Sequence, residues 1–569
     1  SEWHHVVFRS TVLAADTLQI DVYVDGKIED DLSGYKVSPT TGDITNFLNN
    51  GTLRISPNSS YDGSIDDLYF YDRSLSEAEI GLLYNEDAQP AEVVYVNQAA
   101  TGNNDGSSWT DAYSDLQNAF NNISVGNQLW IAKGTYIRTG TNRAASFNWD
   151  EDGLSIYGGF DGTETMLTER DWRKNETILS GDLGTTGDIS DNAYSVMVGP
   201  YVQSSADLIN TTYIDGIIVQ DGNANASGTG KFGRYGGGFF SESYVSNIEF
   251  ANCTFRNNTA VVGGGVNISS EFTKKTATFT NCKFIGNKAR AGAPFDFVTF
   301  GNDQTINIIG SLIAENEVVD LGSDAGLYGH GGRSMAYTGG QMGLSFTNTT
   351  WANNKDNSSS TDKHLLSVHR RFSGGLGFIG VQNCIFSNNE EGDNIFTYPE
   401  IANNGTFFGR IASNSLFNDT NSVDATTKID IIQGDAQFTD LANGDYSIKP
   451  TSPAKDKGVQ NSDNPDFDLA GNPRIHGIAI DLGCYESRGS AAISKVTNET
   501  VSVYPNPTSG ILNIKSDKNI TNVSVLNLAG QKVLESNNTS IDVSNLPTGM
   551  YILQTEGTEG LGTARFIKQ

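Results

Sequence analysis

The chain lacks several features that would assign it quickly. It has four cysteines and six histidines in 569 residues, and no run of 18 apolar residues. Without such a run, no segment is predicted to span a membrane as a helix. Four scattered cysteines are too few for a disulfide scaffold, and since none forms a Cys-x-x-Cys pair, a zinc knuckle or a thioredoxin-type site is not expected.

Positive charge is also scarce. The 37 Lys and Arg stand against 67 Asp and Glu, which gives a net charge of −30. Nucleic acids and anionic membranes are bound through clustered basic side chains, so neither is predicted as a partner. With 37% hydrophobic residues, 62 glycines and only 18% charged residues, the composition is typical of a folded chain rather than a disordered one. The length predicts several domains or one long repetitive domain.

Residues 1–88 form the first predicted domain, built from short β-strands. A strand at 22–24 ends at a turn beginning with Asp25, another strand covers 64–71, and a short helix follows at 76–84. This order resembles the second half of a laminin-G-like, concanavalin-type jelly roll. The resemblance implies a partial sandwich and sugar binding, sometimes with calcium. Asp25, Asp66 and Asp67 are the nearest carboxylates, but turn and strand-edge positions explain them better than ligand roles.

A seven-residue pattern recurs in the middle of the chain, within residues 92–487. It reads Asn, small residue, any residue, large apolar residue, any two residues, Asn. The small and the large residue are two apart, so on a strand both face the same side. The large residues are Phe255, Phe284, Ile313, Trp351 and Phe386, and the closing asparagines are Asn258, Asn287, Asn316, Asn354 and Asn389.

This repeat predicts the fold of the middle domain. Asparagine tolerates tight turns, and asparagines stacked one coil apart can form side-chain ladders. We therefore expect an all-β chain whose centre is a right-handed parallel β-helix of about a dozen coils. A single amphipathic helix near 111–122 is expected to cap its N-terminal end.

Two resemblances agree with this fold. The Phe-x-x-Asn and Gly-Gly repeats over about 210–390 resemble the polymorphic outer-membrane-protein repeats of bacterial surface β-helices. The series of short motifs at 445–448, 452–458, 468–474 and 480–486 is similar to the tail of choice-of-anchor β-helix proteins. Cys253, Cys282 and Cys384 share the small inward position, where buried free thiols are favoured. The distance between adjacent coils would also allow a Cys253–Cys282 disulfide.

Residues 496–569 form the last predicted domain. Short strands punctuated by Gly and Pro indicate a small β-sandwich. Its motifs resemble the type A sorting domain of the type IX secretion system. The residues that carry this resemblance are Tyr504, Pro505, Asn506, Pro507, Gly510, Gly530, Gly549, Tyr551 and Lys568.

The sorting resemblance implies a location. It implies export across the outer membrane of a Gram-negative bacterium by the type IX secretion machinery. It also implies removal of this domain and attachment or release of the remainder at the cell surface. The chain opens at Ser1 with a strand pattern rather than a signal peptide, which fits either a cytosolic protein or a fragment. The sorting motifs favour the fragment.

The activity remains a choice between hypotheses. His330, Arg333, His369 and Arg370 form a cationic cluster that could abstract a proton or bind an acidic sugar, but solvation or pairing with acidic residues is the favoured explanation. The preferred hypothesis is a non-enzymatic adhesin or glycan-binding rod. The alternatives are an extracellular lyase or glycoside hydrolase acting on acidic polysaccharide, and a purely structural stalk. Calcium would suit the many Asp and Asn loops, but no ligand set is evident.

Overall fold

The computed structural model describes residues 6–14, 17–24, 27–28, 35–37, 92–487 and 501–569. Within these ranges it leaves gaps at 125, 151–152, 200–210, 229, 244–246, 271–274, 301–302, 322–329, 337–340, 360–362, 371–376, 391–394, 398–408, 420–424, 426, 462–463, 476, 517–519, 527–531 and 558–559. Asp25, Asp66, Asp67, Gly530 and the helix expected at 76–84 lie outside the described residues.

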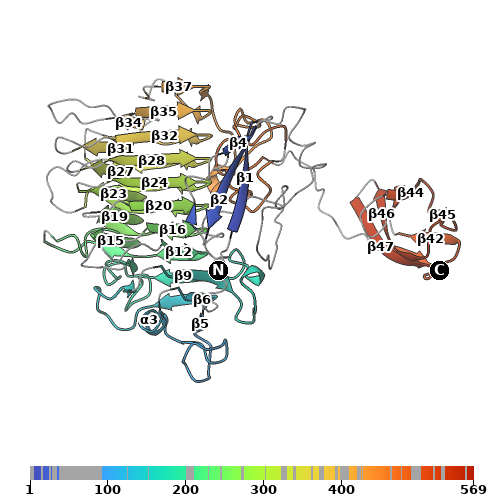
Figure 1. The fold of residues 1–569 in the computed structure, drawn as a ribbon, viewed down its shortest axis with the longest axis horizontal. Helices are drawn as coiled ribbons and strands as arrows, with labels where there is room; N and C mark the ends of the chain where they lie inside the picture. The colour runs from blue at the N-terminus through green and yellow to red at the C-terminus, as the bar shows by residue number, and fades with distance from the viewer. Residues whose placement is uncertain are drawn as a thin grey trace, which may run out of the picture.

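Each central coil of the middle domain contributes one strand to each of four parallel sheets. One coil contains β16 (Asn247–Ala251), β17 (Thr254–Arg256), β18 (Thr259–Val262) and β19 (Val266–Ser270). Each strand pairs in parallel with the equivalent strand of the next coil. In Figure 1 these strands lie one above another as a stack. The predicted all-β fold with a central parallel β-helix is confirmed.

The two longest sheets run along the stack. The eleven-stranded sheet contains β5 (Val93–Val96), β6 (Gln128–Ala132), β9 (Ser155–Phe160), β12 (Thr211–Asp215), β16, β20 (Lys275–Thr280), β24 (Gln304–Ile309), β28 (Met342–Thr347), β32 (Gly377–Gln382), β35 (Gly409–Ser413) and β37 (Thr427–Ile429). The ten-stranded sheet contains β7 (Gly134–Ile137), β10 (Thr177–Ser180), β13 (Ile217–Gln220), β17, β21 (Lys283–Ile285), β25 (Leu312–Ala314), β29 (Thr350–Ala352), β33 (Ile385–Ser387), β36 (Leu416–Phe417) and β38 (Ile432–Gln433).

Two shorter sheets complete the wall of the helix. The eight-stranded sheet contains β8 (Phe147–Asn148), β11 (Met197–Val198), β15 (Phe239–Ser243), β19, β23 (Phe295–Thr299), β27 (His330–Ala336), β31 (His364–Arg370) and β34 (Ile395–Thr397). The five-stranded sheet contains β14 (Asn223–Ala224), β18, β22 (Lys288–Ala291), β26 (Glu317–Val318) and β30 (Lys355–Asp356).

The interior of the rod is a column of large apolar side chains. Phe255, Phe284, Ile313, Trp351 and Phe386 are consecutive partners in the ten-stranded sheet, and each is 0% exposed. The rings of Phe255 and Phe284 stack with centroids 5.3 Å apart, and those of Trp351 and Phe386 stack at 5.9 Å. Stacking like on like brings each apolar residue against its counterpart in the next coil, which keeps the core dry and closely packed.

A ladder of asparagine side chains runs beside this column. Asn287 Nδ2 donates a hydrogen bond to Asn316 Oδ1 at 3.0 Å, and Asn316 Nδ2 donates to Asn354 Oδ1 at 3.0 Å. The same contact joins Asn258 to Asn287 and Asn354 to Asn389. Each amide also bonds backbone, as when Asn316 Nδ2 donates to the Phe284 carbonyl at 2.9 Å. The ladder therefore satisfies turn groups that the coil geometry buries.

The small inward position holds the three repeat cysteines. Cys253, Cys282 and Cys384 are buried and free, as is Cys484. Burial raises the pKa of the Cys384 thiol to about 12. The Cys384 thiol is therefore protonated at neutral pH, and all of these buried thiols pack as small apolar groups.

The capping element is shorter than the sequence pattern predicts. The helix α3 covers Leu116–Phe120 rather than 111–122, and Asp115 caps it by accepting a hydrogen bond from the Gln117 backbone N–H at 2.7 Å. Phe120 is 3% exposed and stacks on Trp149 at 5.5 Å. Residues on both sides of α3 form turns instead of helix, so only one helical turn carries the buried face.

The end of the middle domain folds back along the outside of the ten-stranded sheet. This segment, residues 434–487, includes β39 (Phe438–Asp440), the 3-10 turn η3 (Leu441–Asn443) and β40 (Asp445–Ile448). Its apolar side chains share one cluster with outward residues of the sheet, including Leu312 and Ile385. Polar contacts fasten it at separate coils: Val459 N–H donates to Asn383 Oδ1 at 2.9 Å, and Asn348 Nδ2 donates to Asn464 Oδ1 at 2.7 Å.

A buried charged cluster closes this returning segment. Arg474 Nη2 donates to the Asp481 carbonyl at 3.1 Å, and Arg474 Nε lies 3.3 Å from Glu486 Oε1. The Glu486 backbone N–H donates to Asp468 Oδ2 at 3.0 Å. Burial raises the pKa of the Glu486 carboxyl to about 8, because desolvation outweighs the attraction of Arg474.

The N-terminal and C-terminal segments form separate antiparallel sheets. The first contains β1 (Val6–Ala14), β2 (Thr17–Val24), β3 (Lys27–Ile28) and β4 (Tyr35–Val37). The C-terminal segment has a three-stranded sheet of β41 (Ser502–Tyr504), β42 (Ile511–Lys515) and β45 (Ser540–Asp542), and a four-stranded sheet of β43 (Ile520–Leu526), β44 (Lys532–Ser536), β46 (Gly549–Gly557) and β47 (Gly560–Lys568). Leu512, Val525 and Phe566 share the core of this small sandwich.

The asparagine ladder predicts that an Asn→Asp substitution lowers stability far more inside the ladder than beside it. Asn316→Asp keeps the shape of the side chain but replaces a buried donor with a charged acceptor that faces the Phe284 carbonyl. We expect the free energy of unfolding to fall by about 3 kcal/mol, measured by chemical denaturation. The matched control, Asn388→Asp at an exposed turn next to the ladder, should change it by less than about 0.5 kcal/mol. Equal losses in the two variants would contradict the ladder.

The buried carboxyl predicts a pH dependence for the returning segment. The folded state keeps a proton on Glu486 up to about pH 8, whereas the unfolded chain releases it near the ordinary glutamate value. The folded state therefore binds more protons in this window, and stability decreases as pH rises through it. The free energy of unfolding decreases between pH 5 and pH 8.5, and this decrease should be about 2 kcal/mol smaller in Glu486→Gln than in the unmodified chain. Thermal denaturation at the two pH values measures it. An unchanged pH profile would show that Glu486 titrates normally.

Candidate functional site

The outward faces of the three longest sheets differ in what covers them. The returning segment covers much of the ten-stranded sheet. On the eight-stranded sheet, the outward row Asn267, Asp296, Arg333 and Ser367 is buried, with exposures between 0% and 3%. The central outward positions of the eleven-stranded sheet are mostly exposed or half-buried. Among the described parts of these three sheets, this last face has the most exposed outward positions.

Arg333 is the member of the predicted cationic cluster whose side chain the structure describes. Its Nε lies 2.5 Å from Asp296 Oδ1, and the side chains are 4% and 0% exposed. Asn267 Nδ2 donates to the other carboxylate oxygen of Asp296 at 2.8 Å, and Ser269 Oγ donates to Asn267 Oδ1 at 3.2 Å. A guanidinium held in this way stabilises a buried carboxylate, and it is not presented to a substrate.

The other three members are placed by strand register alone. His330 pairs with His364 on the neighbouring strand, His369 pairs with Met335, and Arg370 pairs with Ala336. All four candidates therefore lie on the adjacent strands β27 and β31. The side chains of His330, His369 and Arg370 lie outside the described residues.

The central part of the eleven-stranded sheet carries three outward rows, which we call the open face. It comprises the outward positions of β20, β24, β28, β32 and β35. The first row is Thr276, Thr305, Gly343, Phe378 and Gly409; the second is Thr278, Asn307, Ser345, Gly380 and Ile411; the third is Thr280, Ile309, Thr347, Gln382 and Ser413.

No position of the open face carries a charge. Its polar groups are hydroxyls and amides, and they begin to form a network: Ser345 Oγ donates to Asn307 Oδ1 at 2.7 Å. The first carboxylate in these rows is Glu249 on β16, beyond the edge of the face, where burial raises its pKa. Neutral donors and acceptors can exchange water for the hydroxyl groups of a ligand without desolvating an ion.

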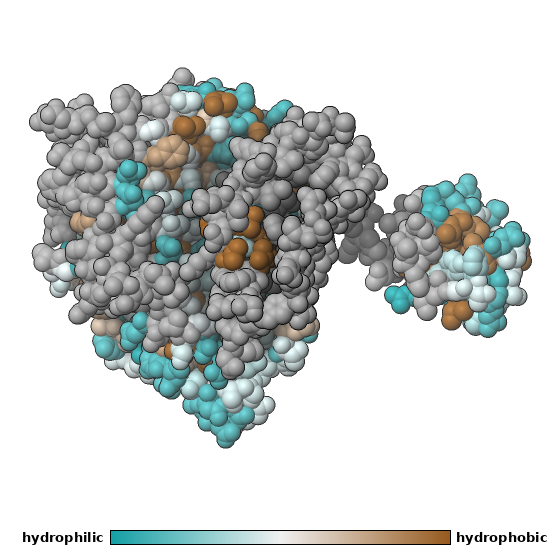
Figure 2. Space-filling view, viewed as in Figure 1, coloured by the Kyte–Doolittle hydropathy of each residue, from teal (hydrophilic) through white to brown (hydrophobic). Residues whose placement is uncertain are grey.

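An aromatic cluster closes the N-terminal end of the same sheet. Trp130 stacks on Phe160 with centroids 4.7 Å apart, and Tyr95 and Trp109 pack around them. Trp130 is only 4% exposed and Phe160 is 0% exposed, so these two rings are core, and Tyr95 and Trp109 are partly buried against them. Figure 2 shows mainly hydrophilic surface at this end of the rod.

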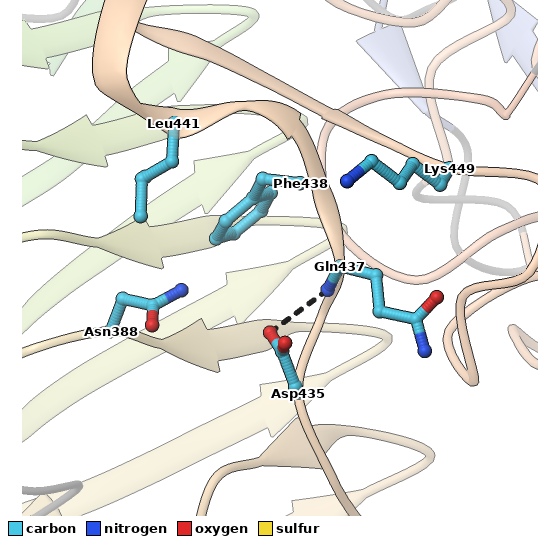
Figure 3. A pocket seen from close by; sticks show the side chains of 6 residues that line it. All are labelled: Asn388, Asp435, Gln437, Phe438, Leu441 and Lys449. Atoms are coloured by element: carbon cyan, nitrogen blue, oxygen red, sulfur yellow. Dashed lines mark hydrogen bonds between the residues drawn. The ribbon is translucent and has the colours of Figure 1, made fainter.

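A depression of about 440 Å³ lies where the returning segment meets the rod. Asn388, Asp435, Gln437, Phe438, Leu441 and Lys449 line it, and Figure 3 shows Lys449 and Phe438 directed toward the same space. Phe438 is only 6% exposed and packs edge-on against Tyr446 at 5.6 Å, so its ring is part of the core. With one carboxylate and one amine, the lining offers no carboxylate pair for glycoside hydrolysis.

The described residues contain no group of three or more His, Cys, Asp or Glu side chains arranged to hold an ion. The calcium expected from the composition stays a prediction.

The sorting motif is built around one asparagine. Asn506 Nδ2 donates to the Arg565 carbonyl at 2.9 Å, and Asn506 Oδ1 accepts from the Ile567 N–H at 2.9 Å. Tyr551 donates to the Pro547 carbonyl at 2.8 Å, and Lys568 is 6% exposed. The remaining described motif residues, Tyr504, Pro505, Pro507, Gly510 and Gly549, lie in β41, the loop after it, and the start of β46.

Comparison with known families confirms both terminal resemblances. Residues 502–569 match the family described as a secretion system C-terminal sorting domain, and residues 1–81 match the concanavalin A-like lectin/glucanases superfamily. The chain therefore carries a type IX sorting domain and is a secreted or cell-surface protein. None of its described helices is long and apolar enough to cross a membrane.

Full-length comparisons add little. The search of curated proteins gives no match. Among solved structures, the crystal structure of pectate lyase Pel9A aligns with 70% of this chain and 96% of its own length, at 12% identity and a TM-score of 0.31. A similarity of this size supports no conclusion about activity.

Sequence reasoning did not single out the open face. The available signal was the alternation of threonines at 276, 278 and 280 with apolar residues, followed by Thr305 and Asn307. That pattern indicates a strand with a polar outer side. It does not reveal that four further strands align equivalent neutral positions beside it.

The Arg333–Asp296 pair predicts a structural rather than a catalytic role. Arg333→Met leaves Asp296 buried without its cation and should lower the free energy of unfolding by about 3–5 kcal/mol, measured by chemical denaturation. Adding Asp296→Asn removes the orphaned charge, so the double variant should be more stable than the single one. A stable Arg333→Met protein that loses turnover of a polysaccharide would contradict this assignment.

Proposed function

We propose that this chain is a secreted or surface-attached, non-enzymatic glycan-binding protein, and that the open face is its binding surface. The observation that carries the proposal is the array of uncharged outward positions across five neighbouring strands, most of which hold hydroxyl or amide side chains. The proposal includes three domains at 1–88, 92–487 and 496–569. The type IX secretion machinery acts on the last of these, and extracellular glycans are the partners of the first two.

Three further observations support a binding role. The sorting domain makes the chain a secreted or cell-surface protein, which can meet extracellular glycans. The N-terminal match is to a superfamily that includes lectins. The described cation of the predicted catalytic cluster is committed to a buried ion pair, which weakens the case for a lyase that uses Arg333.

Strand geometry suits an extended ligand. Neighbouring strands lie about 4.8 Å apart, and alternate residues on one strand lie about 6.7 Å apart. The open face therefore repeats its donors and acceptors along two directions at short intervals. An extended polysaccharide can contact several rows at once, so weak individual hydrogen bonds add into useful affinity.

The test is glycan binding by the full chain. We expect retardation in affinity gels containing uncharged polysaccharides. Asn307→Asp keeps the hydrogen bond from Ser345 but places a charge in the middle of the face, so it should weaken binding about tenfold. The control is Asn418→Asp at an exposed turn outside the face, which should bind like the unmodified chain.

Other outcomes would favour the alternatives. Formation of unsaturated sugar ends from uronic-acid polysaccharides, lost in His369→Ala, would overturn the proposal in favour of a lyase. Failure to bind any polysaccharide would leave a structural stalk.

A further inference from the structure

One exposed aromatic side chain lies within the open face. Phe378 is the first outward residue of β32 and is 42% exposed, although most large apolar residues of the rod are buried. Figure 2 shows hydrophobic surface near the upper end of the rod, where β32, β35 and β37 lie. An exposed phenylalanine on this largely polar, uncharged face needs a physical explanation.

Glycines surround this ring on three sides. Gly343 on β28 and Gly409 on β35 are its partners in the neighbouring strands, and Gly380 is the next outward residue on its own strand. A Cβ atom at Gly380 would lie 3.1 Å from Phe378 Cε1, and one at Gly409 would lie 3.0 Å from Cδ2. The ring therefore lies close over the glycine backbone, and side chains at these positions would displace it.

The third glycine leaves space instead. A Cβ at Gly343 would have no neighbour closer than 3.9 Å. Next to this gap are Thr305 on β24 and Ser345 on β28, both neutral and at least partly exposed. The arrangement is a flat aromatic ring, an adjoining recess with no side chain, and hydroxyl groups at its edge.

Such a combination matches the two surfaces of a sugar. A pyranose whose hydroxyls are equatorial presents C–H groups on its ring faces and hydroxyls around its rim. The C–H face packs on an aromatic ring, while the rim hydroxyls exchange hydrogen bonds with neutral side chains. Because no charged residue occupies the open face, an anionic sugar would find no counter-charge there.

We propose that Phe378 is the stacking platform of a sugar subsite that binds one ring of an uncharged glycan with equatorial hydroxyls. Gly380 and Gly409 let the aromatic ring lie flat, and Gly343 makes room for the neighbouring part of the ligand. This subsite rests on the proposed glycan-binding function and narrows it to a ligand class and to a position on the face.

A structural role for the same ring makes a different prediction. Aromatic side chains can also cover glycine backbone in a sheet and stabilise it. In that case Phe378→Leu would preserve the apolar cover and ligand binding together. In the stacking role Phe378→Leu keeps stability but loses affinity, while Phe378→Trp keeps both.

The experiment is titration calorimetry of the full chain with cellohexaose and xylohexaose, whose hydroxyls are equatorial, as neutral probes, and with a hexamer of galacturonic acid as the charged comparison. We expect binding of at least one neutral probe, an affinity about tenfold or more weaker in Phe378→Ala and Phe378→Leu, and retained affinity in Phe378→Trp. The matched control is Ile429→Ala, which removes an exposed apolar side chain on β37 without touching an aromatic ring. It should bind as the unmodified chain does. Thermal denaturation of every variant confirms that it is folded.

The outcomes separate the two proposals. If neutral probes bind and Phe378→Ala or Phe378→Leu binds equally well, the subsite is overturned and the glycan-binding function stands. If no neutral probe binds while the galacturonic acid hexamer does, the ligand class is overturned. If no probe or polysaccharide binds, the proposed function itself fails, and the subsite falls with it.

Discussion

The requirement that every coil stack on an equivalent copy of itself governs this protein. Backbone hydrogen bonds between coils fix one register, and the asparagine ladder from Asn258 to Asn389 holds the same turn in each layer. A shift of one residue would place apolar side chains outside and polar ones inside. Because register is fixed along the whole stack, outward positions align into rows as strictly as inward ones do.

Alignment in rows also constrains charge. Equivalent residues in neighbouring coils lie about 4.8 Å apart, where like charges destabilise a sheet. The chain has a net charge of −30, yet the open face between Thr276 and Ser413 carries none. Neutral side chains on this face therefore avoid repulsion between stacked coils, and they also provide a surface suited to an uncharged ligand. The buried side chains of Arg333 and Asp296 pair with each other.

The returning segment seals one side of the stack. Its apolar residues cover the outward face of the ten-stranded sheet, and contacts at Asn348 and Asn383 attach it to separate coils. A short-stranded parallel sheet with an apolar outer side would otherwise expose Leu312 and Ile385 to water. The segment thus covers this side of the stack, while the central outward positions of the eleven-stranded sheet stay more exposed.

The sequence by itself determined the fold class, because Phe255, Asn258 and their repeats carry the coil period, and Tyr504 to Lys568 carry the sorting motifs. It could not determine the length of α3, which depends on how much of Leu116–Phe120 packs on the rod. Nor could it show that Arg333 meets Asp296, a residue 37 positions away, since nothing in either local pattern marks the other. Only the tertiary structure decided that Gly343, Phe378 and Gly409 lie side by side. Irregular loops separate these residues in the chain, and the stacking of coils alone brings them together.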